Sequence, residues 1–545
     1  MQNTSSSQTK SNVLPERIDY RRYTSLIHFM EEKFSMYGDL VMFENMGTKL
    51  TYKQVDQLSQ NFCSYLQQYT DLKVGDRIAL QLPNILPYPI ALLGALRAGL
   101  IVVNTNPNYT PYEMSLQFKD ASLDAIVVLE NFASKLESVL KESHIKNIII
   151  VRIGDMMGFT KRNFVNFIVK HIRRLIPKYN LPKPVFFREA IKMGSKIAYQ
   201  KVDLQATDTA FLQYTGGTTG SLKAAILTHQ NMIANTQQLS PVVTHYLQPK
   251  QERILMPLPC YHIFGLGGIF SMAAIGSKML FIADPRDTSS LLHLLQVHKP
   301  TCIMGVQTLF EKLLKHKRFK KIDFSLLKLT VSGGMSVHSK IKDQWTKSTN
   351  GAFVEGYGLT ECSPVVTVQM SNMCHMPLPN TSIIIADNDG NPVPYGHMGE
   401  ILVKGPQVFK GYLNQEAATE HAFINGWFKT GDIARMDQDG CIQILDRKKD
   451  MINISGFNVY PNEIEQVLVK HPKVLDASVI GISDLSFKES IKAFIVKKDA
   501  TLTAEEIIKF CQEKLTKYKI PKYIEFRNSL PKSALGKTLR RLLKD

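Results

Sequence analysis

Cysteine is scarce in this 545-residue chain and stands in no metal-binding or redox pattern. The seven cysteines are scattered, with no C-x-x-C pair and no zinc spacing. The sequence therefore predicts reduced thiols in the core of a cytosolic protein. The first residues, M-Q-N-T-S-S-S-Q-T-K-S-N, also lack the apolar run of a secretory signal. We expect a cytoplasmic protein whose residues 1–18 form a disordered tail.

Long hydrophobic runs without proline are missing as well. Two charge-free runs, Ile78–Leu96 and Ile254–Ser277, have the length of a membrane span, but prolines interrupt both. They are more typical of buried strand–turn–helix segments than of a bilayer helix. The sequence predicts no transmembrane helix.

Acidic residues are too few to balance the basic ones. The chain has 66 Lys and Arg against 48 Asp and Glu, a formal net charge of +18. Such an excess suits nucleic acid, anionic lipid or anionic small substrates. No nucleic-acid motif is present, and aromatic residues are not interleaved with the basic runs, so we expect no nucleic-acid partner.

The length and the hydrophobic pattern indicate at least two domains of the α/β type. From Gly75 onward, short apolar runs of strand length alternate with helical patterns, as in Arg77–Leu82 followed by Ile85–Ala98. This alternation predicts parallel sheets covered by helices on both faces.

The segment Leu212–His229, L-Q-Y-T-G-G-T-T-G-S-L-K-A-A-I-L-T-H, places a Gly/Thr loop between two apolar strands. Its glycines expose backbone N–H groups, and its hydroxyls and lysine suit a polyphosphate. A polar hairpin turn is the alternative, and no Walker A pattern fits. The candidate phosphate-binding residues are Thr215, Gly216, Gly217, Thr218, Thr219, Gly220 and Lys223.

Two later segments carry groups that would complete a nucleotide site. In Glu355–Pro364, E-G-Y-G-L-T-E-C-S-P, a tyrosine between glycines can stack on a base, and the glutamate is a hard oxygen ligand for Mg²⁺. In Gly426–Asp439, a T-G-D turn ends in Asp432, which can accept hydroxyl groups. Taken alone, T-G-D is equally an Asx turn.

Together these motifs closely resemble those of the adenylate-forming superfamily, which includes acyl-CoA synthetases, luciferases and the adenylation domains of peptide synthetases. L-Q-Y-T-G-G-T-T-G-S-L-K looks most like the loop of bacterial long-chain fatty acid–CoA ligases. Leu222 and Ala224 depart from the pattern, which has Pro or Ala before the lysine and Gly after it. The resemblance spans roughly residue 20 to the end.

The resemblance implies an α/β architecture of two unequal domains. Residues 19–445 would form a large AMP-binding and acyl-substrate domain, with two helix-covered sheets and a small barrel-like β subdomain. Residues 446–545 would form a small, mobile α+β domain. The charged stretch I-Q-I-L-D-R-K-K-D lies between apolar runs and fits an exposed linker. By resemblance, Asp446 is its hinge.

The resemblance also implies a role for each candidate residue. Tyr357 would stack on adenine, next to the S-G-G turn at Gly333, and Thr360 would contact the α-phosphate. Glu361 and Thr215 would bind Mg²⁺, Asp432 the ribose, and Arg447 the nucleotide. His262 would line the carboxylate pocket beside Phe264, although a lone histidine near apolar residues is more often a core residue. Ser455 and Gly456 would line the CoA tunnel, and Lys537 would be the catalytic lysine.

These roles describe an ATP-dependent acid–thiol ligase that forms AMP. A fatty acid and ATP would give acyl-AMP and pyrophosphate, and CoA would then take the acyl group. An acyl-AMP ligase with another acceptor and a non-catalytic acyl- or nucleotide-binding relative are the alternatives. The acyl chain length and the oligomeric state stay open, a homodimer included.

A basic, amphipathic insertion at residues 158–195 allows two interpretations. Phe164, Phe167, Ile168 and Ile172 recur at helical spacing among lysines and arginines. A helix packed on the domain is the more ordinary interpretation. The other is a surface helix that touches an anionic membrane, such as the cytoplasmic face of the inner membrane, from which a long-chain fatty acid would enter.

Overall fold

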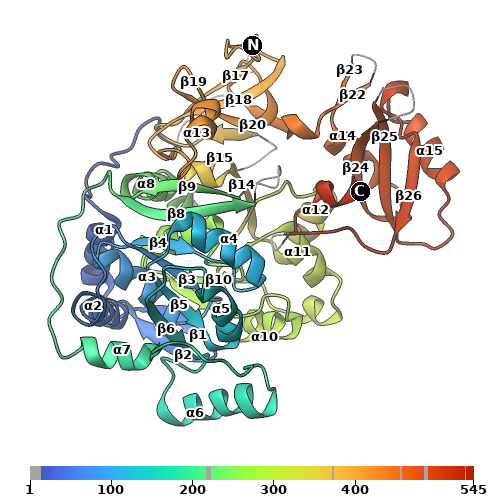
Figure 1. Ribbon diagram of the computed structural model, residues 1–545. Helices are drawn as coiled ribbons and strands as arrows, with labels where there is room; N and C mark the ends of the chain where they lie inside the picture. The colour runs from blue at the N-terminus through green and yellow to red at the C-terminus, as the bar shows by residue number, and fades with distance from the viewer. Residues whose placement is uncertain are drawn as a thin grey trace, which may run out of the picture.

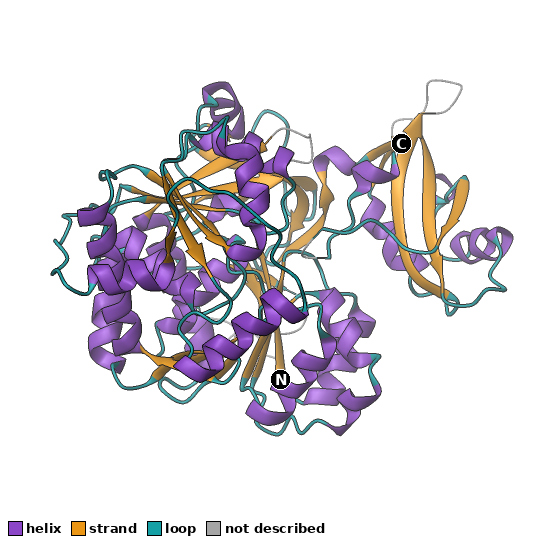
Figure 2. Ribbon diagram, turned by 60° about the horizontal axis from the view of Figure 1, so that its bottom comes forward, coloured by secondary structure: helices purple, strands orange, loops and turns teal. Residues whose placement is uncertain are grey.

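The computed structural model describes residues 14–216, 222–370, 374–454, 457–483, 489–533 and 536–544. A large domain of mixed α/β structure carries a smaller α+β domain at its side (Figure 1). Figure 2 shows helices on both sides of the sheets of the large domain. The predicted fold class is therefore confirmed.

The first sheet of the large domain is parallel except at one edge. Its order is β7 (Val185–Phe186), β6 (Asn147–Val151), β5 (Ala125–Leu129), β3 (Arg77–Gln81), β4 (Ile101–Asn104), β8 (Thr209–Gly216) and β9 (Leu222–Thr228). Only β8 and β9 pair in antiparallel fashion, and they flank the Gly/Thr loop. The associated helices are α2 (Tyr52–Tyr69), α3 (Pro87–Arg97), α4 (Pro111–Ala121), α5 (Ala133–Leu140) and α7 (Phe187–Gly194).

The second sheet joins a parallel half to an antiparallel half. The parallel half contains β1 (Val41–Asn45), β11 (Lys278–Phe281), β10 (Arg253–Met256), β12 (Cys302–Gly305), β13 (Leu329–Gly333) and β14 (Ala352–Gly358), with β2 (Thr48–Thr51) antiparallel at its edge. The antiparallel half contains β15 (Val365–Gln369), β16 (His375–Pro377), β21 (Ile442–Arg447), β20 (Trp427–Met436), β18 (Met398–Lys404) and β17 (Ser382–Ala386), with β19 (Phe423–Ile424) beside β20. The strands of the expected β subdomain thus continue this sheet.

Seven helices accompany this second sheet along the described chain. They are α1 (Leu26–Tyr37), α8 (His229–Tyr246), α9 (Ile263–Ala273), α10 (Thr288–His298), α11 (Gln307–Leu314), α12 (Ser339–Thr349) and α13 (Glu416–Ala422). Helix α8 follows β9 without a linker, because Thr228 and Asn231 form a capping box that starts the helix. The capped turn fixes the end of the strand that leaves the Gly/Thr loop.

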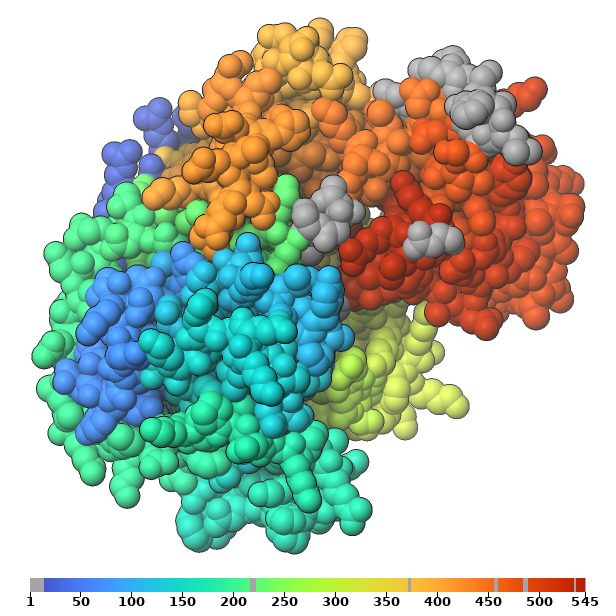
Figure 3. Space-filling model, viewed as in Figure 1, coloured from blue at the N-terminus to red at the C-terminus, as the bar shows by residue number. Residues whose placement is uncertain are grey.

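The small domain has its own hydrophobic core. A two-stranded sheet, β22 (Ile452–Ile454) and β23 (Phe457–Val459), precedes α14 (Pro461–Leu468). A three-stranded sheet follows, made of β24 (Val474–Ser483), β25 (Glu489–Lys497) and β26 (Tyr523–Arg527), with α15 (Ala504–Gln512) between β25 and β26. Figure 3 shows the red surface of this domain against the α11–α12 region of the large domain.

The cysteines correct one expectation. Five of them, including Cys260 and Cys362, are buried free thiols, as the sequence predicts. Cys374 and Cys441, however, are paired as a disulfide across neighbouring strands. The prediction of reduced thiols is wrong for these two, because the pairing of β16 with β21 brings together residues that are 67 positions apart.

The basic insertion begins with a surface helix that has a half-buried side. Helix α6 (Phe159–Phe167) continues into a π-helix (Ile168–Ile172), and neither contains a buried residue. Figure 1 shows α6 projecting from the edge of the large domain. Both interpretations stay open, because half-buried residues such as Val165 and Ile168 alternate with the exposed ones, and Asn166 accepts a hydrogen bond from the Gly154 backbone N–H. Across the described residues, no helix combines the length and hydropathy needed to cross a bilayer, in line with the sequence.

Candidate active site

Tyr357, Asp432 and Arg447 form one hydrogen-bonded cluster, although they come from three strands. The Tyr357 hydroxyl donates to Asp432 Oδ2 at 2.6 Å, and Arg447 Nε lies 2.7 Å from Oδ1. The antiparallel register of β20 and β21 places Asp432 directly opposite Arg447. Burial raises the pKa of the Asp432 carboxyl, while the Arg447 guanidinium opposes that shift. A buried carboxylate held this way can also accept two further hydroxyl groups.

Lys537 faces this cluster from the small domain. Its pKa is lowered to about 8, first by the surrounding protein and then by the charge of Arg447, while Asp432 and Asp450 act in the opposite direction. The side chain still reaches solvent and is therefore not part of a core. The structure therefore brings together residues that are about a hundred positions apart in the sequence.

Glu361 lies in a second cluster beside the Gly/Thr loop. The Tyr412 hydroxyl donates to Glu361 Oε1 at 2.8 Å, and Lys223 Nζ lies 4.9 Å from the centroid of the Tyr412 ring. Thr360 and Glu361 belong to a short 3₁₀ turn after β14. The cluster joins the candidate metal ligand to the candidate phosphate lysine through one aromatic residue.

Tyr412 was not identified from the sequence. It lies 51 residues from Glu361, in a segment with no pattern that would connect the two. An isolated bridge between Ala225 and Tyr412 holds it beside β9. Only the folded chain shows that this tyrosine contacts both motifs.

The Gly/Thr loop connects two paired strands, and the structure describes its two ends. Thr215 pairs with Lys223 and Gly216 with Leu222 across the hairpin. Gly217, Thr218, Thr219 and Gly220 lie outside the described residues. Ala224, where the resembled pattern has Gly, is a buried residue within β9 and pairs with Tyr214. It lies in the strand and not in the loop.

His262 and Phe264 begin helix α9 next to Gly333. His262 caps the helix, and its Nδ1 accepts a hydrogen bond from the Phe264 backbone N–H at 3.3 Å. Burial lowers the pKa of His262 to about 4, so the ring is neutral near pH 7 and its proton is on Nε2. A Cβ added to Gly333 would lie 3.1 Å from the Phe264 ring. A neutral N–H donor and a narrow apolar wall can accommodate a carboxylate headgroup with its chain.

Asp446, the expected hinge, is buried at the end of β21 and contacts the small domain. Its carboxylate accepts from the Asn462 backbone N–H at 2.7 Å and from Arg540 at 3.1 Å. Ser455 and Gly456, the expected tunnel residues, lie outside the described part of the chain. Among described residues, no group of three or more His, Cys, Asp or Glu side chains could hold a metal ion.

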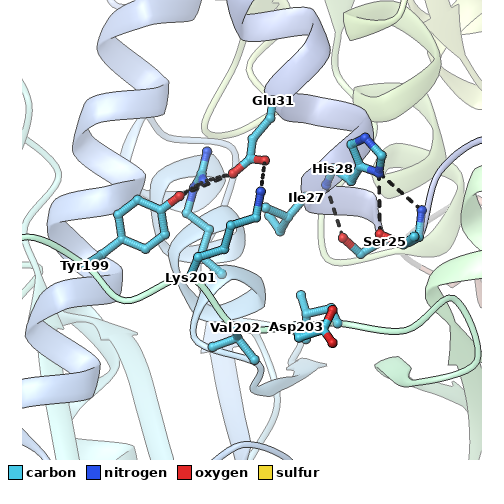
Figure 4. A pocket seen from close by; sticks show the side chains of 11 residues that line it. Ser25, Ile27, His28, Glu31, Tyr199, Lys201, Val202 and Asp203 are labelled. Atoms are coloured by element: carbon cyan, nitrogen blue, oxygen red, sulfur yellow. Dashed lines mark hydrogen bonds and ion pairs between the residues drawn. The ribbon is translucent and has the colours of Figure 1, made fainter.

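A separate pocket lies far from these clusters in the chain, between α1 and the segment that follows α7 (Figure 4). Its charged groups bind one another: Glu31 accepts from Arg97 at 2.9 Å and from Lys201 at 3.1 Å. Arg97 also bonds Asp56. This arrangement is a satisfied ion-pair network, so we assign the pocket no role in the candidate site.

Comparison with known proteins gives one consistent family. Residues 30–413 match the family model described as AMP-binding enzyme, and residues 463–537 match that of the AMP-binding enzyme C-terminal domain. A long-chain-fatty-acid–CoA ligase of Yersinia pestis is 47% identical over 98% of this chain and 96% of its own length. The ligase of the same name from Haemophilus influenzae is 43% identical over 97% of this chain and 96% of its own.

Solved structures agree with the fold. The anthranilate CoA ligase AuaEII, in complex with anthranoyl-AMP, superposes with a TM-score of 0.83 at 23% identity, covering 96% of both chains. ATP-bound MatB from Rhodopseudomonas palustris superposes with a TM-score of 0.81 at 26% identity, covering 95% of this chain and 98% of its own.

Proposed function

The chain belongs to the AMP-binding enzyme family, and from this premise we propose that it is a long-chain fatty acid–CoA ligase. It activates a fatty acid with ATP to acyl-AMP and pyrophosphate, and then transfers the acyl group to CoA. Similarity to ligases of this name over nearly the full length supports the proposal. The observation that carries it is the hydrogen-bonded cluster of Tyr357, Asp432 and Arg447, whose charges are near enough to act on Lys537 of the small domain.

The first half-reaction needs positive charge where the carboxylate meets the α-phosphate. Negative charge accumulates between these oxygens, and fixed cations there lower the barrier. We assign this role to Lys537, with Asp432 holding the ribose and Tyr357 and Gly333 the adenine. Lys223 and the 215–220 loop would hold the β- and γ-phosphates. The His262 Nε2–H would orient the fatty acid carboxylate.

We propose that the metal is Mg²⁺, bound by Glu361 and the Thr215 hydroxyl. Mg²⁺ commonly takes one or two carboxylates, with phosphate oxygens and water as its other ligands. The Tyr412 hydroxyl fixes one oxygen of Glu361, which orients the carboxylate before any metal binds. When bound, the ion would neutralise phosphate charge.

Thioester formation would require a different orientation of the small domain. Lys537 serves only the first step, and the proposed tunnel residues Ser455 and Gly456 serve only the second. A rotation of the small domain about Asp446 would bring first Lys537 and then the tunnel residues to the bound substrate. Lys537→Ala should abolish acyl-AMP formation and leave thioester formation from supplied acyl-AMP nearly intact.

The decisive assay follows acyl-CoA and pyrophosphate with ATP, Mg²⁺, CoA and saturated fatty acids from about eight carbons upward. Each buried methylene adds about 0.8 kcal/mol, so affinity should rise with chain length until the pocket is full. Pyrophosphate release without consumption of CoA would favour an acyl-AMP ligase with another acceptor. No pyrophosphate release with any acid would leave only a binding protein.

We also propose that residues 159–175 contact an anionic bilayer. Phe159, Phe164, Phe167, Ile172 and Leu175 are all more than half exposed. Lys161, Lys170, Arg173 and Arg174 lie exposed among them. Apolar side chains beside basic ones are complementary to lipid headgroups and acyl chains. This surface would bring the enzyme to the source of its insoluble substrate.

Vesicle sedimentation tests this contact with the full-length protein. We expect binding to phosphatidylglycerol vesicles that weakens with salt, and little binding to phosphatidylcholine vesicles. Phe164→Ala/Phe167→Ala should lose most of the binding. Val297→Ala/Leu326→Ala, which removes two exposed apolar side chains elsewhere, is the matched control. Equal loss in both variants, or equal binding to both lipids, would contradict the proposal.

A further inference from the structure

Arg540 binds more charged partners than any group that the proposed mechanism uses. Its guanidinium lies 3.1 Å from Asp446, 3.0 Å from Asp450 and 2.9 Å from Glu465. It also donates to the Asn462 side chain at 2.6 Å. Only 13% of the Arg540 side chain is exposed, so these bonds are largely shielded from water.

Arg540 joins the expected hinge residue itself to the small domain. Asp446 is the residue before the last in β21 and pairs with Ile433 of β20, which ties it to the large domain. Asn462 and Glu465 lie on α14 of the small domain, and Glu465 also accepts from the Val479 backbone N–H in β24. Rotation of the small domain about Asp446 therefore acts on the Arg540–Asp446 bond, whereas the bonds to Asn462 and Glu465 move with the domain.

Arg540 is also close to Lys537 along the chain. The Lys532–Thr538 bridge and the Ser533–Lys537 backbone bond close a small hairpin that carries the lysine. Leu539 N bonds Pro531 O at the base of that hairpin, and Arg540 follows at once. The guanidinium therefore fixes the base of the hairpin to the hinge carboxylate.

We propose that Arg540 is a positioning residue that holds the small domain in the orientation in which Lys537 faces Asp432 and Arg447. The proposal deepens the proposed function, since this is the orientation that forms acyl-AMP. Removing the guanidinium leaves three neighbouring carboxylates that repel one another, and rotation about Asp446 moves that carboxylate away from the other two.

Arg540→Ala separates this role from a purely structural one through the two half-reactions. We expect acyl-AMP formation without CoA to fall roughly 100-fold in kcat, with the KM for ATP changed less than about twofold. Thioester formation from supplied acyl-AMP should stay within about twofold. Arg540→Lys keeps the positive charge but not the planar guanidinium with its several N–H donors, so its loss of acyl-AMP formation should be intermediate. Arg541→Ala, an exposed neighbour, is the matched control.

A distance measurement tests the proposal without any turnover. Spin labels at Leu326→Cys and Tyr523→Cys, one exposed site on each domain, should give one narrow distance in the parent and a broadened or second distance in Arg540→Ala. Asp450→Asn, which removes one of the three negative charges around Arg540, provides a milder variant if Arg540→Ala does not fold. An unchanged distance distribution, or equal loss of both half-reactions with a lower Tm, would overturn the proposal. An inactive parent with the expected distance shift would instead count against the ligase function alone.

Discussion

At the scale of single residues, the surrounding protein shifts the pKa of two side chains in the candidate site. Lys537 lies where desolvation by the surrounding protein and the positive charges of Arg447 and Lys449 lower its pKa to about 8. His262 is held neutral by burial, with its pKa lowered to about 4. A lysine that acts as a fixed cation must be protonated, so its reduced pKa has a direct consequence for the pH range of the enzyme.

The pH profile of acyl-AMP formation should report this lysine. Because the protonated form is the active one, kcat/KM should be level below the pKa and fall about 10-fold per pH unit above about 8. An ordinary lysine would place that fall near 10.4. Pyrophosphate release without CoA, measured from about pH 6 to 10, checks it. A level profile to about pH 10 would show that Lys537 keeps an ordinary pKa in the free enzyme.

At the scale of elements, strands and helices were largely predictable, and side-chain networks were not. Strand β3 (Arg77–Gln81) matches the predicted run Arg77–Leu82 except for its last residue, because an apolar run of this length marks a strand buried on both faces. Helix α3 (Pro87–Arg97) begins two residues inside the predicted Ile85–Ala98, since proline is favoured in the first turn of a helix. The bonds of Arg540 join residues 75 and 94 positions away, so no local pattern reveals them.

The place of Ala224 in β9 gives a prediction at the same scale. Ala224→Gly restores the residue of the resembled pattern, but it lies inside a paired strand. Glycine there should lower the free energy of unfolding by about 0.5–1 kcal/mol, because it loses more backbone freedom on folding. Urea denaturation measures the change, and acyl-AMP formation should remain within about twofold. A gain of several-fold in that rate would mean that Ala224 constrains the phosphate loop.

At the scale of the whole molecule, the proposed reaction depends on how closely the small domain approaches the large one. The contact between Gly536 and Thr308, at the N-terminal end of α11, is tight. Gly536 has a φ of +77°, and an added Cβ would lie 2.4 Å from Thr308 Oγ1. In this orientation the position beside Lys537 accepts no side chain.

Gly536→Ala should therefore impair the acyl-AMP step by two separable effects. Backbone strain at positive φ costs on the order of 1–3 kcal/mol wherever the domain lies, whereas the clash with Thr308 acts only in this orientation. Thr308→Ala removes the two atoms closest to the added Cβ, Oγ1 and Cγ2. In the Gly536→Ala background it should restore part of the acyl-AMP rate, but it should not relieve the backbone strain at residue 536. A double-mutant cycle on the two half-reactions measures the coupling. If the two substitutions are coupled only in acyl-AMP formation, the contact between Gly536 and Thr308 is made in that step alone. If their effects are strictly additive in both half-reactions, Lys537 acts without this close approach of the two domains.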